Sequence, residues 1–155
     1  MTVSVITISD RAFSGEYEDL SGPEIASILR EHFGDVAIRN EVVPDEADML
    51  LDAFDRHAGS DFILTTGGTG ISDRDITPET TKNYCDRALP GVSEALRAES
   101  YRETPSAVLS RGEAGMKGNT IIVNFPGSVR AVRLCTRVLI PVMKHAVGMA
   151  RGEGH

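Results

Sequence analysis

The first half of the chain alternates between short apolar runs and stretches with apolar residues at helical spacing. Residues 36–43 predict one strand; residues 3–8 are almost entirely β-branched, and Phe62–Thr66 form another short run of apolar or β-branched residues. Such runs are typical of strands that are buried on both faces of a parallel sheet. Between them, apolar stripes predict helices that end at Gly34 and Gly59. This order predicts right-handed crossovers and an α/β fold, a three-layer sandwich with a mostly parallel central sheet flanked by helices on both faces.

The second half of the chain continues with helices and two more strands. We expect helices over residues 78–88 and 92–101, and strands over residues 106–110 and 119–125. A last helix should begin at about Ser128, and Pro141 should kink it because proline removes one helical hydrogen bond. In this interpretation residues 1–150 form a single domain and residues 151–155 a flexible tail. The apolar face expected for the last helix comprises Val132, Cys135, Val138, Leu139, Val142 and Ala146.

The stretch from residue 61 to residue 79 carries the strongest chemical signal. A buried strand runs into a glycine loop, then a charged loop, then a helix start at which Thr77 suits the N-cap and Pro78 the first helical position. Glycines let the backbone adopt positive φ angles and lie close to a ligand, and threonine hydroxyls can donate hydrogen bonds. In open α/β sheets, ligands bind at the carboxyl ends of the strands. The loop consists of Thr66, Gly67, Gly68, Thr69 and Gly70.

A glycine turn of this kind is by itself structural about as often as it is functional. It is not a Walker A loop, because no Gly-Lys-Ser/Thr follows, and its spacing does not match the dinucleotide-binding fingerprint. The charged residues Asp73, Arg74 and Asp75 behind the glycines favour a functional role. A second strand runs into a small-residue turn at residues 124–128. Two such turns at one edge of a parallel sheet predict a single cleft.

Composition and charge narrow the class of ligand. The 155 residues have a formal net charge of −7 and a pI near 5.1, which argues against a broad basic surface for nucleic acid. An anionic ligand would therefore be held by local cations, backbone N–H groups or a metal ion. Cys85 and Cys135 lie far apart in sequence, so we expect two free thiols in a reducing compartment. We find no secretory signal and no bilayer-spanning apolar run, and expect a cytoplasmic protein without membrane or nucleic-acid partners.

Several motifs occur together, in an order that covers nearly the whole chain. The most specific are residues 64–70 (LTTGGTG), 74–79 (RDITPE) and 124–127 (NFPG). They are accompanied by residues 9–11 (SDR), 21–23 (SGP), 44–46 (PDE), 90–91 (PG) and 109–111 (LSR). Each motif alone is weak, but together they resemble the MogA/MoaB family of molybdenum cofactor biosynthesis, and most of all its molybdopterin adenylyltransferase branch.

The resemblance implies an activity for the chain. It implies a homotrimer that transfers AMP from Mg-ATP to the terminal phosphate of molybdopterin and releases pyrophosphate. ATP and molybdopterin would be the substrates, and Mg²⁺ the cofactor. The adenylylated product would then pass to a partner enzyme that inserts molybdate.

The resemblance also implies which residues form the site. Asp45 and Asp75 match the two acidic positions that the family needs for activity, and our hypothesis is that both hold Mg²⁺, an ion that prefers oxygen ligands. Each could instead simply cap the helix that follows it. Arg11, Arg74 and Arg111 are candidate clamps for anionic groups. The residues expected to bind nucleotide and pterin are Ser9, Arg11, Thr66, Gly67, Gly68, Thr69, Gly70, Arg74, Ser110, Arg111, Asn124, Pro126, Gly127 and Ser128.

Other functions on the same fold stay open at this point. A non-catalytic molybdopterin-binding or scaffold protein would keep the pocket without turnover, although the presence of both Asp45 and Asp75 argues against it. The amino-terminal domain type of competence-damage proteins shares a glycine loop but usually comes fused to a second domain, and molybdate insertion belongs to larger relatives. Adenylyl transfer itself needs positioning and charge neutralisation rather than a strong base, because the attacking phosphate oxygen is already ionised.

Overall fold

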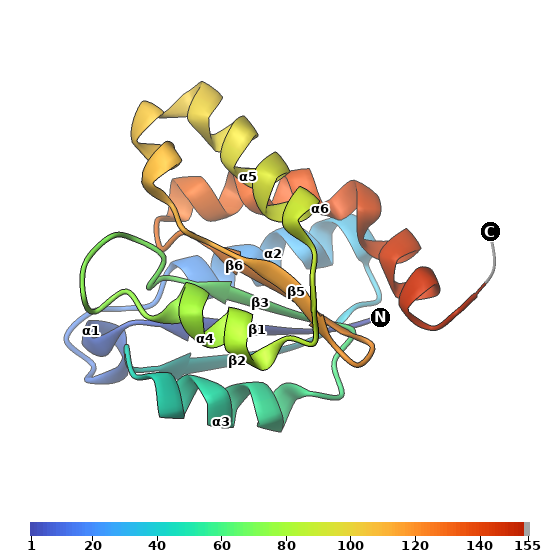
Figure 1. The fold of residues 1–155 in the computed structure, drawn as a ribbon, viewed down its shortest axis with the longest axis horizontal. Coiled ribbons are helices and arrows are strands. Elements are labelled where there is room, and N and C mark those ends of the chain that lie inside the picture. The colour runs from blue at the N-terminus through green and yellow to red at the C-terminus, as the bar shows by residue number, and fades with distance from the viewer. Residues whose placement is uncertain (154–155) are drawn as a thin grey trace.

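A single six-stranded sheet forms the centre of the protein in the computed structural model, which describes residues 1–153 (Figure 1). Its strands are β1 (Thr2–Ile8), β2 (Ala37–Val43), β3 (Phe62–Thr66), β4 (Arg87–Ala88), β5 (Ala114–Lys117) and β6 (Thr120–Phe125). They lie in the order β2-β1-β3-β6-β5-β4. The first four in this order are parallel, and β5 and β4 each run antiparallel to the strand before them. The predicted mostly parallel α/β fold is confirmed.

Helices cover both faces of this sheet (Figure 1). They are α1 (Asp10–Phe13), α2 (Ser21–Phe33), α3 (Ala47–His57), α4 (Thr77–Tyr84), α5 (Pro90–Glu103), the 3₁₀ helix η1 (Pro105–Leu109) and α6 (Val129–Ala150). α2 and α5 both pack against α6, whereas α3 packs against α4 on the opposite face. The sheet is therefore the middle layer of three.

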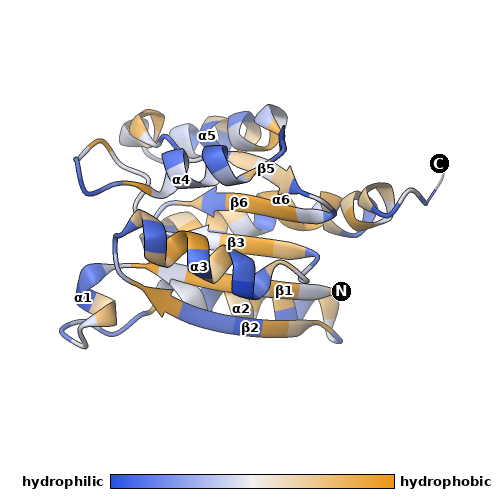
Figure 2. Cartoon of the chain, turned by 60° about the horizontal axis from the view of Figure 1, so that its bottom comes forward, coloured by the Kyte–Doolittle hydropathy of each residue, from blue (hydrophilic) through white to orange (hydrophobic). Residues whose placement is uncertain are grey.

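Two apolar cores result from the two-residue period of the buried strands. In β1, Val3 and Val5 point into the core beneath α2 and α6, while Ile6 and Ile8 point into the core beneath α3. Side chains on both faces of β3 and β6 likewise enter the packed interior, so these strands are buried at every position. Both ribbons are largely orange in Figure 2. β2 is polar along its middle and lies at the edge of the sheet, where charged side chains discourage pairing with another chain.

The expected elements before residue 78 are found with small shifts at their ends, and the later ones required several corrections. The helix expected over residues 78–88 ends at Tyr84, because the chain then pairs with β5 as the short strand β4. The strand expected over residues 106–110 is wrong, since η1 occupies this segment and starts at Pro105, whose ring favours a helical φ angle. The segment between the two expected strands, residues 111–118, contains β5.

The last helix starts as predicted, with the Ser128 hydroxyl accepting a hydrogen bond from the Ala131 backbone N–H at 3.2 Å. Its buried face differs from the prediction: Val142 is 48% exposed, and Thr136, Ile140 and Met143 are buried although they were not predicted. Within residues 1–153, no helix is long and apolar enough to cross a membrane. Of the expected tail, residues 151–152 form a turn after the helix, and residues 154–155 lie outside the described residues.

Candidate active site

Four parallel strands end at the same edge of the sheet, and the segments that follow them meet there (Figure 1). Strand register places Ile8 beside Val43, and Thr66 beside Phe125. The chain therefore brings together, at one edge, the residues after β1, the residues around Asp45, the glycine loop and the turn at residues 126–128. This is the convergence that the two strand-to-turn junctions predicted.

The glycine loop and the turn after β6 pack backbone against backbone. Gly67 has a φ angle of +100°, and a Cβ atom there would lie 2.3 Å from the Ile8 carbonyl oxygen. A Cβ atom on Gly127 would lie 3.3 Å from the Gly67 Cα. The Thr66 hydroxyl donates to the Pro126 carbonyl at 2.8 Å, which ties the two turns together. Glycine is required at position 67 because no other residue combines this φ angle with so close an approach.

Thr77 anchors the start of α4 in a different way from the one predicted. Its hydroxyl donates to the Gly67 carbonyl at 3.0 Å, and its backbone N–H donates to the Gly68 carbonyl at 3.1 Å. It is not the N-cap, because Ile76 takes that position and Thr77 already belongs to the helix. A Cβ atom on Gly68 would lie 2.4 Å from the Thr77 hydroxyl oxygen. The threonine therefore fixes the glycine loop against the helix N-terminus.

Asp45 faces the glycine loop from the end of β2. Its Oδ2 accepts a hydrogen bond from the Asp10 backbone N–H at 2.9 Å, and its Oδ1 lies 3.3 Å from the place that a Cβ of Gly68 would occupy. Partial burial raises the pKa of Asp45, and the hydrogen bond from Asp10 only partly opposes this. The Asp45 carboxylate is thus held in one orientation beside the loop and would gain from a nearby cation.

Asp75 faces the same loop from its other end. Its Oδ2 accepts hydrogen bonds from the Ser72 backbone N–H at 2.9 Å and from the Ser72 hydroxyl at 2.7 Å. This oxygen lies 2.8 Å from the place that a Cβ of Gly70 would occupy. Burial acts to raise the pKa of Asp75, but the hydrogen bonds from Ser72 and Gly70 and the charge of Arg111 lower it overall. The carboxylate is therefore ionised at neutral pH and turned toward the glycine backbone.

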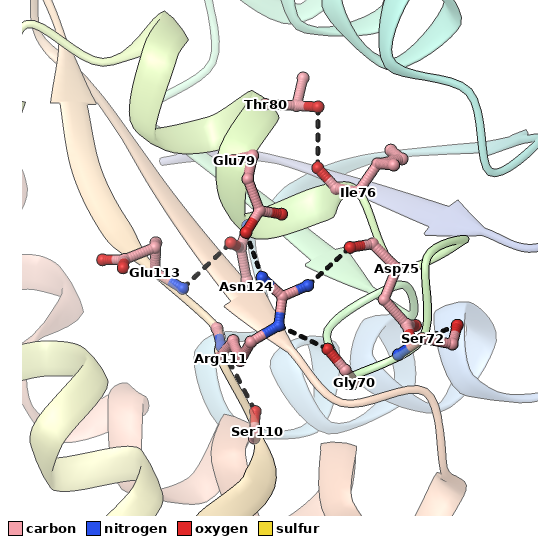
Figure 3. Close-up of polar contacts among 11 residues, drawn as sticks. Gly70, Ser72, Asp75, Ile76, Glu79, Thr80, Ser110, Arg111, Glu113 and Asn124 are labelled. Atoms are coloured by element: carbon pink, nitrogen blue, oxygen red, sulfur yellow. Dashed lines mark hydrogen bonds and ion pairs between the residues drawn. The ribbon is translucent and has the colours of Figure 1, made fainter.

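Arg111 fixes the position of the charged loop, residues 72–75, and of the segments next to it (Figure 3). Its Nε donates to the Gly70 carbonyl at 2.6 Å, one terminal nitrogen donates to the Asp75 carbonyl at 2.7 Å, and the other forms an ion pair with Glu79. Its backbone N–H also donates to the Thr69 carbonyl at 2.9 Å. All three side-chain nitrogens are thus engaged within the protein. The structure supports a bracing role for Arg111 rather than the free anion clamp that the sequence suggested.

Two hollows adjoin this loop. The first, called the main cleft below, has a volume of about 580 Å³ and lies between the glycine loop and the wall formed by α5, η1 and the start of α6. The second, called the side cleft, has about 620 Å³ and lies between the charged loop, α3 and α4. Ile71 and Asp75 line both of them. The charged loop is consequently the partition between two spaces of ligand size.

Most of the residues predicted to bind substrates line the main cleft. They are Gly67, Gly68, Thr69, Gly70, Ser110, Pro126, Gly127 and Ser128, and Asp75 joins them. Ser9 and Thr66 instead line a smaller hollow of about 140 Å³ that shares Gly67 and Gly127 with the main cleft. Arg11 is exposed and stacks over the Tyr17 ring at 5.2 Å from its centroid. Arg74 is exposed and forms an ion pair with Asp10 at 2.5 Å.

Asn124 does not line the main cleft. Its side-chain N–H₂ group donates to the hydroxyls of Thr65 and Thr81, each at 2.9 Å, and its oxygen accepts from the Glu113 backbone N–H at 3.1 Å (Figure 3). It is 4% exposed. Because side chains alternate along β6, Asn124 points to the α4 face of the sheet, while the main cleft lies on the α5 and α6 face. Its side chain thus links β6 to β3 and α4.

The far wall of the main cleft was not predicted from the sequence. This wall is contributed by Ser100, Glu103, Thr104, Ala107, Leu109, Arg130 and Leu134, among others. The available signal was the recurrence of small and polar residues on one face of α5 at helical spacing, ending at residue 104. That signal does not say what the face adjoins, because the position of α5 is set by its packing on α6.

The acidic residues at this edge determine whether a magnesium ion could be held there. Within the described part of the chain, no group of three or more His, Cys, Asp or Glu residues is arranged to hold a metal ion. Mg²⁺ in nucleotide sites is commonly bound by one or two carboxylates together with substrate phosphates and water. Asp45 and Asp75, on either side of the glycine loop, fit an ion that arrives with a triphosphate rather than a resident ion.

Comparisons with known proteins agree over almost the whole chain. Residues 4–145 match the family described as "Probable molybdopterin binding domain". A Helicobacter pylori (strain J99) protein named molybdopterin adenylyltransferase is 38% identical, over 97% of this chain and 88% of the relative. The Drosophila melanogaster molybdenum cofactor synthesis protein cinnamon is 37% identical, over 95% of this chain and 25% of that protein. The crystal structure of the molybdopterin biosynthesis enzyme MoaB from Thermus thermophilus has a TM-score of 0.88 and 39% identity, covering 97% of this chain and 96% of that chain. The chain therefore belongs to the MogA/MoaB family of molybdenum cofactor biosynthesis.

Proposed function

We propose that this protein is a molybdopterin adenylyltransferase, which transfers AMP from Mg-ATP to the terminal phosphate of molybdopterin and releases pyrophosphate. The observation that carries the proposal is the placement of Asp45 and Asp75 on either side of a glycine loop that lines a cleft of about 580 Å³. Relatives named for this activity, at 38% identity, support it.

The reaction exchanges one phosphorus–oxygen bond for another. An oxygen of the molybdopterin phosphate forms a bond to the α-phosphorus of ATP, the bond from that phosphorus to the bridging oxygen breaks, and pyrophosphate leaves. No proton has to be removed from the attacking group, because a phosphate monoester already carries negative charge at neutral pH. The protein therefore acts by holding two anionic substrates in line.

The chain offers several groups for this task. The backbone N–H groups of Gly68 and Thr69, and that of Arg130 in the first turn of α6, belong to residues that line the main cleft and can approach phosphate oxygens there. Mg²⁺, when bound, would neutralise phosphate charge, and Asp45 and Asp75 would hold it. Arg111 keeps the loop in place through the Gly70 and Asp75 carbonyls. Arg74 and Arg11 are exposed cations near the rim of the site.

The test is direct. The purified protein is incubated with molybdopterin and Mg-ATP, and pyrophosphate and adenylylated molybdopterin are quantified together. Equal amounts of both products support the proposal. A folded protein that binds molybdopterin but releases no pyrophosphate would instead be the non-catalytic scaffold of the alternative hypothesis.

The remaining expectations are part of the same proposal. We propose a homotrimer in the cytoplasm that passes its product to a molybdate-insertion enzyme, and a single domain over residues 1–150. Molar mass from light scattering tests the first of these: a mass of three chains supports it and a mass of one chain contradicts it.

A further inference from the structure

Asp10 connects three separate segments at the rim of the site. One carboxylate oxygen accepts the Asp45 backbone N–H at 3.0 Å, and the other accepts a terminal nitrogen of Arg74 at 2.5 Å. The Asp10 backbone N–H in turn donates to the Asp45 carboxylate at 2.9 Å. The end of β1, the end of β2 and the charged loop are thus joined through one side chain.

The bonds between Asp10 and Asp45 are reciprocal, and this fixes the direction of the Asp45 carboxylate. Its Oδ2 is held by the Asp10 backbone, so its Oδ1 is the oxygen turned to Gly68. The Asp45 backbone is held at the same time by the Asp10 carboxylate. A residue whose backbone N–H and one carboxylate oxygen are both held loses less freedom when it meets a metal-bound phosphate, which is the reason that such outer partners strengthen a metal site.

The ion pair with Arg74 has little value for stability, because both side chains are about half exposed to water. Its geometric effect is larger. Arg74 lies on the exposed charged loop and has a long flexible side chain, and the pair keeps its guanidinium next to Asp10 and Asp45. The hydrogen bond from Arg74 lowers the pKa of Asp10, so the pair is charged at neutral pH.

We propose that Asp10 is a positioning residue of the adenylyl transfer: its side chain fixes the Asp45 backbone, and with it the direction of the Asp45 carboxylate, and keeps the Arg74 guanidinium beside it, so that both face an incoming metal–nucleotide complex. The proposal rests on the proposed function. Asp10 itself does not touch the substrate in this account. It acts through the two residues that do.

The experiment compares Asp10→Ala with Asp10→Asn. Asparagine keeps an oxygen for the Asp45 N–H but removes the negative charge that holds Arg74, whereas alanine removes both. Affinity is measured with Mn²⁺·ATP by electron paramagnetic resonance, a readout that does not require turnover. The kcat and the KM for ATP are measured separately with molybdopterin present.

Asp86 provides a matched control. Its carboxylate also accepts one backbone N–H, from Gly118 at 3.2 Å, and pairs with one cation, Lys117 at 3.0 Å. Its exposure, 55% of the side chain, is close to the 47% of Asp10. It lies beside β4, away from the residues that line the main cleft. Asp86→Ala therefore removes the same kinds of contact at a place where no substrate is expected.

Asp10→Ala should weaken Mn²⁺·ATP binding about tenfold or more, the usual effect of losing a partner that orients a metal ligand. Asp10→Asn should recover part of this loss, and Asp86→Ala should bind as the wild type does. Equal affinities for Asp10→Ala and Asp86→Ala would overturn the inference. If Asp10→Ala does not fold, Asp10→Asn decides, since wild-type affinity and kcat in that isosteric variant contradict the role of the charge.

The outcome is separable from that of the proposed function. A wild type whose affinity for Mn²⁺·ATP depends on Asp10, but which forms no adenylylated product, would contradict the adenylyltransferase and leave the positioning role standing. A wild type that binds no Mn²⁺·ATP would remove both.

Discussion

Gly67→Ala is the substitution whose cost follows most directly from the structure. Gly67 has a φ angle of +100°, and the new Cβ would lie 2.3 Å from the Ile8 carbonyl oxygen. The positive φ angle costs roughly 1–2 kcal/mol for a residue with a side chain. The clash adds roughly 1–3 kcal/mol, because the oxygen belongs to the backbone at the end of the buried strand β1 and cannot rotate away. The free energy of unfolding should therefore fall by roughly 2–5 kcal/mol.

Gly15→Ala is the matched control. Gly15 also has a positive φ angle, +80°, but nothing lies within 4 Å of the place that its Cβ would take. Only the cost of the φ angle, roughly 1–2 kcal/mol, should be seen there. Both variants and the wild type are unfolded in urea at one protein concentration, and the free energies of unfolding are compared. Equal destabilisation of the two variants would refute the argument that Gly67 is needed for the close approach of the glycine loop to β1.

Three further predictions concern the acids and the buried amide. Asp75→Asn should abolish adenylylated molybdopterin while the far-ultraviolet circular dichroism spectrum stays unchanged, and near-normal turnover with Mg-ATP would remove Asp75 from the mechanism. Asp45→Ala should chiefly raise the Mg²⁺ concentration needed for half-maximal rate, and an unaltered Mg²⁺ dependence would count against a metal role. Asn124→Ala leaves two buried hydroxyls and the Glu113 N–H without their partner. It should therefore lower the free energy of unfolding, measured in urea titrations, by about 2–4 kcal/mol. A loss under about 1 kcal/mol would contradict the role of Asn124 in holding these segments together.

The half of the chain before residue 78 was predictable because its elements are locally consistent. Residues 3–8 and 62–66 are buried and, apart from Ser4, consist of apolar or β-branched residues, and Gly34 ends its helix with the positive φ angle expected of a helix terminator. Ser128 starts α6 in the same local way, with its hydroxyl bonded to a backbone N–H three residues on. Each of these depends on neighbours within a few residues, so the pattern alone suffices.

The region between residues 84 and 118 was not predictable in this way. Residues 85–88 have no strand pattern, and residues 87–88 become β4 only because the chain pairs with β5, where Asp86 and Leu89 donate backbone hydrogen bonds to Met116 and Ala114. Val108 and Leu109 suggest a strand by composition, yet they belong to η1 and are more than half exposed. The partner strand and the starting proline overrode local preference here.

The candidate site also has features that the sequence predicted and features that it did not. The sequence by itself determined that Asp45 would follow one parallel strand, and the glycine loop and Asp75 another, at one edge of a sheet, because the order of elements along the chain and the residue types are both local information. Only the tertiary structure decided which atoms each side chain meets: Arg111 donates to the Gly70 and Asp75 carbonyls, Asn124 points away from the main cleft, and Asp10 binds both Asp45 and Arg74. Those contacts join residues that are 35 to 64 positions apart in the sequence. Residues so far apart come into contact only when the sheet and its covering helices pack together.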